Sequence, residues 1–142
     1  MPSFTTQVPN LMEKGPLVQI SLAVGTILED ILKRDSQNIP APLQVSAMID
    51  TGATRTVVRD DMVGQLTLNP VGKVLITTAS STNIQCYEYL VRLLFPNNVI
   101  VETVAIAAPL RGQNIQCLIG RDVLKHGVLI YIGYINAFTL SF

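Results

Sequence analysis

One carboxylate in this sequence stands in a setting where chemistry is possible. The stretch AMIDTGATRTVV, residues 47–58, places Asp50 between an apolar run and a glycine-containing turn, after which apolar residues resume. An aspartate at the end of a strand is ordinarily a turn former, because its side chain accepts a hydrogen bond from the backbone two residues on. The choice between this structural role and a chemical one depends on the rest of the chain.

A carboxylate can activate a water molecule as a general base, but hydrolysis of an amide also needs an acid that protonates the leaving nitrogen. One aspartate does not fill both roles at once, whereas two carboxylates a few ångströms apart share one proton. No second Asp-Thr-Gly turn occurs in the chain. A two-fold axis that places Asp50 beside its own copy in a second identical chain is the simplest source of a pair.

Other aspartates in the chain have structural interpretations. Asp60 and Asp61 lie on a charged stretch that predicts a solvated surface. Asp122 follows a Gly-Arg pair, where it can cap a short helix and pair with a basic side chain. A pattern similar to that around Asp50 occurs twice in the chain: residues 48–52 and residues 118–122 each end an apolar run in a sharp turn that contains glycine.

The composition predicts one compact domain. The chain has 142 residues, of which 49% are apolar and 14% are charged, so it can form a real core and is not disordered. We expect part of the apolar surplus to be buried between subunits. The formal net charge is zero and the basic residues are scattered, so the chain lacks the basic patch typical of a nucleic-acid-binding protein, and we expect no nucleic-acid partner.

The cysteines and the single histidine do not predict a metal or nucleophile site. Cys86 and Cys117 have no Cys or His neighbours at metal-ligand spacing, so we expect two buried free thiols, no zinc site and no cofactor. His126 precedes Gly127 at an expected helix end, where an imidazole commonly acts as a C-terminal cap. This structural role is favoured over a catalytic one, because no Ser or Cys nucleophile has a recognisable setting around it.

The apolar run at residues 15–28 is too short to span a bilayer. It contains Gln19 and Ser21, and Glu29 and Asp30 follow in place of a cleavage site of small residues, so it predicts a strand and not a signal peptide. We therefore expect a cytoplasmic protein without a membrane partner.

The pattern of apolar residues predicts a short-stranded β protein. Residues 1–14 carry two prolines and no clear period and predict an N-terminal arm, with the folded domain over residues 15–142. Turn signals separate about eight strands, which is typical of an all-β sandwich or barrel. The expected strands are residues 17–24, 43–49, 56–58, a hairpin over 71–95 with its tip at 80–83, then 99–108, 115–120, 128–134 and 137–142. Short helices are expected near 26–32, where Thr26 and Glu29 resemble a capping box, at 59–66 and at 121–127.

Two motifs frame this pattern. Residues 48–54, MIDTGAT, precede the hairpin, and residues 118–122, LIGRD, precede a short helix and the closing strands. Their order resembles that of the retroviral-type, retropepsin-like aspartic proteases, over about residues 15–142. The resemblance implies an all-β, single-lobe acid-protease barrel with a flap hairpin and one short C-terminal helix, active as a two-fold homodimer. The implied activity is that of an aspartic endopeptidase acting on a peptide or protein substrate.

The resemblance also implies a role for each motif residue. Asp50 would be the catalytic carboxylate and would share one proton and one water with Asp50 of the second subunit. Thr51 would hydrogen-bond across the two-fold axis and hold both loops in place. Gly52 would bring its backbone close to an extended substrate, which suits a residue without a Cβ. Gly120 would let the second turn pass close beneath the Asp50 loop, as a structural support.

Further residues would contact the substrate. Ala53 would stay small for the same reason as Gly52, and Thr54 follows it on the same loop. The hairpin tip would form the flap that closes over the peptide and excludes bulk water. Its expected contact residues are Ala79, Ser80, Ser81 and Thr82.

The sequence departs from the viral pattern at three places. The expected flap tip at residues 79–83 has no glycine. Thr54 stands where viral members carry an acidic residue that pairs with the arginine of the Gly-Arg segment, so Arg121 needs another partner, for which we consider Asp60, Asp61 and Asp122. The stretch from residue 25 to residue 42 is longer than the compact viral form requires.

Two alternative functions compete with the protease. A catalytically weak or inactive dimer on the same fold could bind peptides or serve in assembly, since a fold does not prove an activity. The Asp-Thr-Gly turn also resembles the loop of phosphorylated-aspartate ATPases, but that loop requires a Lys between Asp and Thr and further carboxylates for Mg²⁺, and neither is evident. In the dimer that the resemblance implies, residues 137–142 and the first residues of the chain are expected to share a sheet with the partner.

Overall fold

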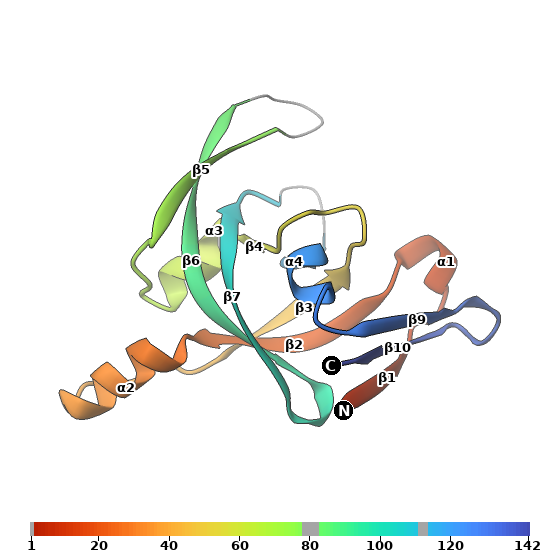
Figure 1. Ribbon diagram of the computed structural model, residues 1–142, viewed down its shortest axis with the longest axis horizontal. Coiled ribbons are helices and arrows are strands. Elements are labelled where there is room, and N and C mark those ends of the chain that lie inside the picture. Colours follow the sequence, from red (N-terminus) through yellow and green to blue (C-terminus); the bar gives the residue numbers. More distant parts are fainter. Residues whose placement is uncertain (1, 78–82, 111–113) are drawn as a thin grey trace.

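The computed structural model describes residues 2–77, 83–110 and 114–142, and these form a mostly β structure with short helices (Figure 1). The strands are β1 Ser3–Gln7, β2 Leu17–Val24, β3 Leu43–Ile49, β4 Val57–Arg59, β5 Gly72–Ile76, β6 Ile84–Phe95, β7 Val99–Ala108, β8 Cys117–Ile119, β9 Val128–Ile132 and β10 Ala137–Ser141. The helices are α1 Leu11–Lys14, α2 Thr26–Arg34, α3 Asp60–Gln65 and α4 Arg121–Leu124, with 3₁₀ turns at Pro96–Asn98 and Gly133–Ile135. The predicted all-β class is confirmed.

Seven of the strands form one sheet that closes on itself. Its order is β2-β3-β8-β4-β7-β6-β5, and β2 pairs in addition with β6. This second pairing closes the sheet into a barrel, which removes most open strand edges. The strands alternate between the core and the outside: in β3, Val45, Ala47 and Ile49 are buried, as the sequence pattern predicts.

The predicted hairpin is present as β5 and β6. Strand β6 has 12 residues and pairs with β5 near its start and with β7 along the rest of its length. The hairpin therefore extends from the barrel wall as a continuation of a core strand (Figure 1). The expected flap tip, with Ala79, Ser80, Ser81 and Thr82, lies outside the described residues.

A second sheet joins the two ends of the chain. Its order is β1-β10-β9, and β1 pairs with β10 from Ser3↔Ser141 to Gln7↔Ala137 (Figure 1). The ring of Phe4 stacks on that of Phe95 at 5.7 Å between centroids and meets the edge of Phe138 at 6.3 Å. The first residues of the chain therefore pack on the barrel core and pair with the closing strand of their own chain.

Helix α2 is present where the sequence predicts a helix, but its predicted capping box is wrong. The N-cap is Gly25 and not Thr26, and the backbone N–H of Thr26 donates to the carboxylate of Glu102 on β7. The Glu29 carboxylate instead pairs with Nζ of Lys33, at 3.2 Å from Oε1, and with Nη2 of Arg92 on β6, at 2.6 Å from Oε2. The carboxylate of Glu102 thus accepts the hydrogen bond from Thr26 that the capping box assigned to Glu29.

Both thiols are buried and free, as predicted. Burial raises the pKa of the Cys117 thiol to about 12, with the charge of Asp122 acting in the same direction, and burial also raises the pKa of Cys86. His126 is exposed just beyond α4. None of the helices in the described part of the chain has the length and apolar character needed to cross a membrane.

Candidate active site

The two similar motifs, residues 48–52 and 118–122, lie side by side in the structure. Strand β3 runs parallel to β8, with Met48 opposite Leu118 and Ile49 opposite Ile119. The backbone N–H of Asp50 donates to the carbonyl of Ile119 at 2.9 Å. Because parallel strands end at the same edge of a sheet, the loop after β3 and the loop after β8 meet there.

Asp50 begins the first loop and is half-buried. Its Oδ1 accepts a hydrogen bond from the N–H of Gly52 at 2.9 Å, and its carbonyl accepts one from the N–H of Ala53 at 3.2 Å. The carboxylate therefore does form the local turn expected of an aspartate at a strand end. Oδ2 accepts no hydrogen bond from the described residues, so the carboxylate keeps one oxygen available for another partner.

Gly120 begins the second loop and is buried directly against the first. A Cβ built on it would lie 2.5 Å from the carbonyl carbon of Arg55 and 2.9 Å from the nitrogen of Thr56. Both contacts are with backbone, which cannot rotate away, so only glycine fits this crossing. Next to it, the N–H groups of Arg121 and Asp122 donate to the carbonyls of Ala53 and Thr54 at 2.9 and 3.2 Å.

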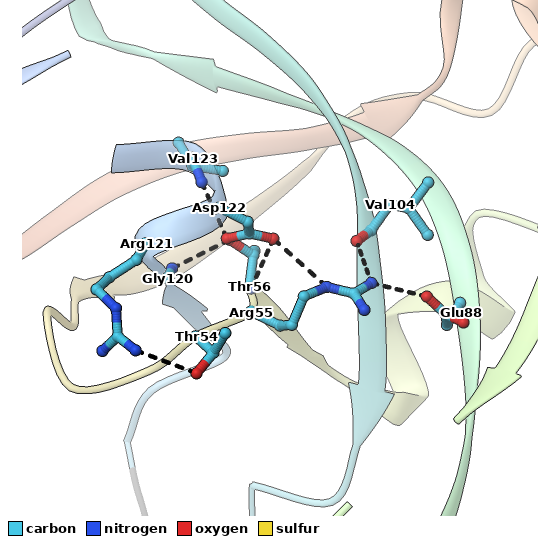
Figure 2. Close-up of polar contacts among 9 residues, drawn as sticks. All are labelled: Thr54, Arg55, Thr56, Glu88, Val104, Gly120, Arg121, Asp122 and Val123. Carbon is cyan, nitrogen blue, oxygen red and sulfur yellow. Dashed lines mark hydrogen bonds and ion pairs between the residues drawn. The ribbon is translucent and has the colours of Figure 1, made fainter. Parts of the chain in front are cut away.

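A second aspartate, Asp122, holds the two loops together (Figure 2). Its Oδ2 accepts from the N–H of Thr56 at 3.0 Å, and its Oδ1 accepts from the Thr56 hydroxyl at 2.8 Å and from the N–H of Val123 at 2.9 Å. The Thr56 oxygen in turn accepts from the N–H of Gly120 at 3.0 Å. Thr56 is 0% exposed and is the buried polar side chain of the described core.

Arg55 extends this network to the hairpin (Figure 2). Its Nη2 donates to Oε2 of Glu88 at 2.7 Å and to the carbonyl of Val104 at 3.0 Å. Its Nε lies 3.8 Å from Oδ2 of Asp122. None of Arg55, Thr56 and Glu88 was predicted as a site residue, although a hydroxyl at the start of an apolar strand was a visible signal for Thr56.

Arg121 has other partners than those considered from the sequence. Its Nη1 donates to the carbonyl of Thr51 at 2.7 Å. Its Nη2 donates to Oγ1 of Thr54 at 3.2 Å, as Figure 2 shows. The predicted partners Asp60, Asp61 and Asp122 are wrong, since the structure turns Arg121 toward the Asp50 loop. Thr54 thus meets the arginine in the place of the viral carboxylate, through a hydroxyl.

The three aspartates considered as partners of Arg121 lie elsewhere or contact other residues. Asp122 faces Arg55 and Thr56, as described above. Asp61 lies at the start of α3 and pairs with Arg59 at 2.7 Å, and this hydrogen bond lowers the pKa of the Asp61 carboxyl. Asp60 precedes it on the same exposed turn.

A cleft of about 460 Å³ lies beside the Asp50 loop. One wall comes from the loop residues Ala53, Thr54 and Arg55, and another comes from residues 74–77, on and after β5. The lining is mostly apolar and includes Ile106 and Leu118. Thr51 and Gly52 are exposed, and the nearest described atom to a Cβ at Gly52 would be Asp50 Oδ1, at 3.1 Å.

The arrangement places a carboxylate on a loop that also lines an apolar cleft. Within residues 2–77, 83–110 and 114–142, the structure contains no cluster of three or more His, Cys, Asp or Glu side chains that could hold a metal ion. Sequence-predicted residues 50–54 and Gly120 are brought together in one pair of loops.

Comparison with known proteins agrees with this geometry. The model of a family described as "Aspartyl protease" matches residues 42–123, more than half of the chain and both loops, so the chain belongs to the aspartyl protease family. No curated protein sequence matches the chain significantly.

Solved structures show the same fold. EIAV protease in complex with the inhibitor HBY-793 is 17% identical, with 84% of this chain and 93% of that chain covered and a TM-score of 0.52. A retropepsin-like aspartic protease from Rickettsia conorii is 10% identical, with 100% and 95% covered and a TM-score of 0.53. The resemblance to retropepsin-like proteases and the predicted all-β barrel fold are therefore confirmed, whereas the homodimer stays a prediction.

Proposed function

We propose that two copies of this chain form an aspartic endopeptidase whose two Asp50 carboxylates together activate one water. The observation that carries the proposal is the position of Asp50: a half-buried carboxylate, with one oxygen free of the described residues, on a loop that also lines an apolar cleft. Membership of the aspartyl protease family supports it.

The chemistry requires a second carboxylate. The nearest aspartate on the adjacent loop, Asp122, is committed to Thr56, Val123 and Arg55. In a two-fold dimer the two Asp50 side chains would share one proton, because two like charges at contact distance do not both ionise. The ionised carboxylate takes a proton from water as the oxygen attacks the peptide carbon, and the protonated one supplies the proton to the leaving nitrogen as the C–N bond breaks.

The remaining predicted residues would bind and position the substrate. Thr51, exposed beside Asp50, would hydrogen-bond across the two-fold axis. Exposed Gly52 would offer its backbone to an extended peptide, and Ala53 and Thr54 would face the substrate from the cleft wall. The apolar lining favours peptides with aliphatic side chains at this position. The tip with Ala79, Ser80, Ser81 and Thr82 would close over the peptide, and the cytoplasm is the expected location.

The test compares Asp50→Asn with Asp30→Asn, an equivalent change at an exposed aspartate on α2. Cleavage of a peptide library is measured from acid to neutral pH, with the oligomeric state followed by sedimentation. Asp50→Asn should lower kcat by about 10²- to 10⁴-fold or more and leave the dimer intact, because it removes the general base. Asp30→Asn should cleave like the wild type.

Two results would contradict the proposal. One is a wild-type protein that cleaves no peptide at any pH in this range while remaining folded. The other is a protein that stays monomeric at every concentration at which it cleaves peptides, since a single chain would then supply the whole site.

A further inference from the structure

Arg55 connects the Asp50 loop to three other parts of the fold. It reaches β6 through Glu88, β7 through the carbonyl of Val104 and α4 through Asp122 (Figure 2). The two residues of the Arg55–Glu88 pair are 33 positions apart in sequence. Such a contact constrains the tertiary arrangement of loop and hairpin and adds nothing to the local conformation of either.

Glu88 sits at the base of the hairpin and is confined on both sides. In the β5–β6 pairing it lies opposite Gly72, the first residue of β5. A Cβ on Gly72 would come within 3.0 Å of Glu88 Oε1, so the missing side chain makes room for the carboxylate. The other oxygen, Oε2, receives the Arg55 guanidinium at 2.7 Å. The carboxylate thus couples the start of β5 to the Asp50 loop.

Strand β5 continues from this point directly into the cleft wall. Val74, Leu75 and Ile76 line the same cleft as Ala53 and Thr54. The Arg55–Glu88 contact therefore links the loop to β6, the strand on which β5 is paired. A movement of β5 and β6 together away from the loop would break this contact.

The contact has the character of a strong tether. The Arg55 and Glu88 side chains are 35% and 20% exposed, and the hydrogen bond is charge-assisted and short. Arg59–Asp61 on the surface is similar in length but joins residues two positions apart, where β4 runs directly into α3, so it links no elements that are distant in sequence. This pair provides a natural control.

We propose that Arg55 is a positioning residue that sets the distance between the Asp50 loop and the hairpin wall of the cleft. The role rests on the proposed protease function, because the cleft it shapes is the one expected to hold the peptide. Arg55 does not act on the scissile bond. Its effect is to keep the two walls in the separation that an extended peptide requires, which pre-organises binding.

The experiment measures the hairpin and the enzyme separately. Amide hydrogen exchange is followed over residues 72–77 in the wild type, Arg55→Met, Arg55→Lys, Glu88→Gln and the control Arg59→Met. KM and kcat are determined for the same proteins on one cleaved peptide. The double variant Arg55→Met/Glu88→Gln separates loss of the tether from the cost of leaving Glu88 unpaired.

Arg55→Met should speed exchange over residues 72–77 and raise KM, each by about tenfold, the size expected for one charge-assisted hydrogen bond. The value of kcat should stay within about twofold, because the tether acts on binding in ground and transition state alike. Arg55→Lys should recover part of both effects, and the double variant should remain as fast in exchange as Arg55→Met. Arg59→Met should match the wild type in all three measurements.

Unchanged exchange and unchanged KM in folded Arg55→Met would overturn the proposal. So would a fall in kcat with unchanged KM, since Arg55 would then act on the chemical step. If Arg55→Met does not fold, the milder Arg55→Lys and Glu88→Gln carry the same test. A wild type without cleavage would refute the protease function, whereas the exchange of residues 72–77 would still decide whether the tether exists.

Discussion

Two aspartates stand on neighbouring loops of this protein and are used in opposite ways. Asp122 accepts hydrogen bonds from Thr56 and Val123 on both of its oxygens and faces Arg55. The Asp50 carboxylate accepts one hydrogen bond from the described residues, from the N–H of Gly52. Among the described residues Asp122 is therefore committed to the fold, while Asp50 keeps an oxygen for another partner.

The glycines of the two loops differ in the same way. Gly120 is packed against backbone of the first loop, and a Cβ there would lie 2.5 Å from the Arg55 carbonyl carbon. Gly52 is exposed, and a Cβ there would meet only its own loop's carboxylate, at 3.1 Å, among described atoms. The Gly120 loop therefore supports the Asp50 loop from within the fold, and the Asp50 loop is exposed at the surface. The two motifs are similar in sequence and do not reveal this difference.

The largest expected effect on stability comes from exchanging the glycines for alanine. Gly120→Ala should lower the free energy of unfolding by about 3 kcal/mol or more, because the new methyl group overlaps backbone that has no room to relax. Gly52→Ala should cost less than about 1 kcal/mol, since its φ is not in the left-handed region and the one close described atom, Asp50 Oδ1 at 3.1 Å, belongs to a side chain that can shift. Urea unfolding of both variants measures the difference. Equal costs would remove the distinction between supporting and presented loop.

The aspartates themselves give the next effect. Asp122→Asn should lower the free energy of unfolding by about 1–3 kcal/mol, because an amide has one acceptor oxygen and its NH₂ would face a buried donor of Thr56 or Val123. Asp50→Asn keeps an oxygen for Gly52 and should change stability by less than about 0.5 kcal/mol. Thermal or urea unfolding of the two single variants is sufficient. A larger loss for Asp50→Asn would reverse the comparison.

The smallest effect concerns Glu29, a paired carboxylate outside the site. Hydrogen bonds from Lys33 and Arg92 lower the pKa of Glu29 below its usual value of 4.5. A lowered folded-state pKa contributes stability above the unfolded pKa, and this contribution is lost as the pH falls through the folded value. Glu29→Gln should therefore reduce stability slightly at neutral pH, and its difference from the wild type should shrink below about pH 4. Urea midpoints across that range measure it, and a difference that grows toward acid would contradict it.

The strand pattern could be predicted from the sequence, whereas the side-chain network could not. Alternation in residues such as Val45, Ala47 and Ile49 marks a half-buried strand locally, and β3 forms at the predicted residues. The partners of Arg121 were mispredicted because a charge was expected to seek an opposite charge. The loop carbonyl of Thr51 and the hydroxyl of Thr54 lie closer, a fact set by how β3 and β8 align.

Sequence alone determined the elements whose signals are local: the strands from β2 onward, the Asp-Thr-Gly turn, the second glycine turn and hence the family and fold, whereas β1 was not predicted. Only the tertiary structure decided which aspartate is structural and which is open, and that Arg55 joins the loop to the hairpin. The bonds of Asp122 to Thr56 span 66 residues and those of Arg55 to Glu88 span 33. Contacts of this separation depend on strand register and loop crossing, so they arise from the closed barrel and not from any one segment of the chain.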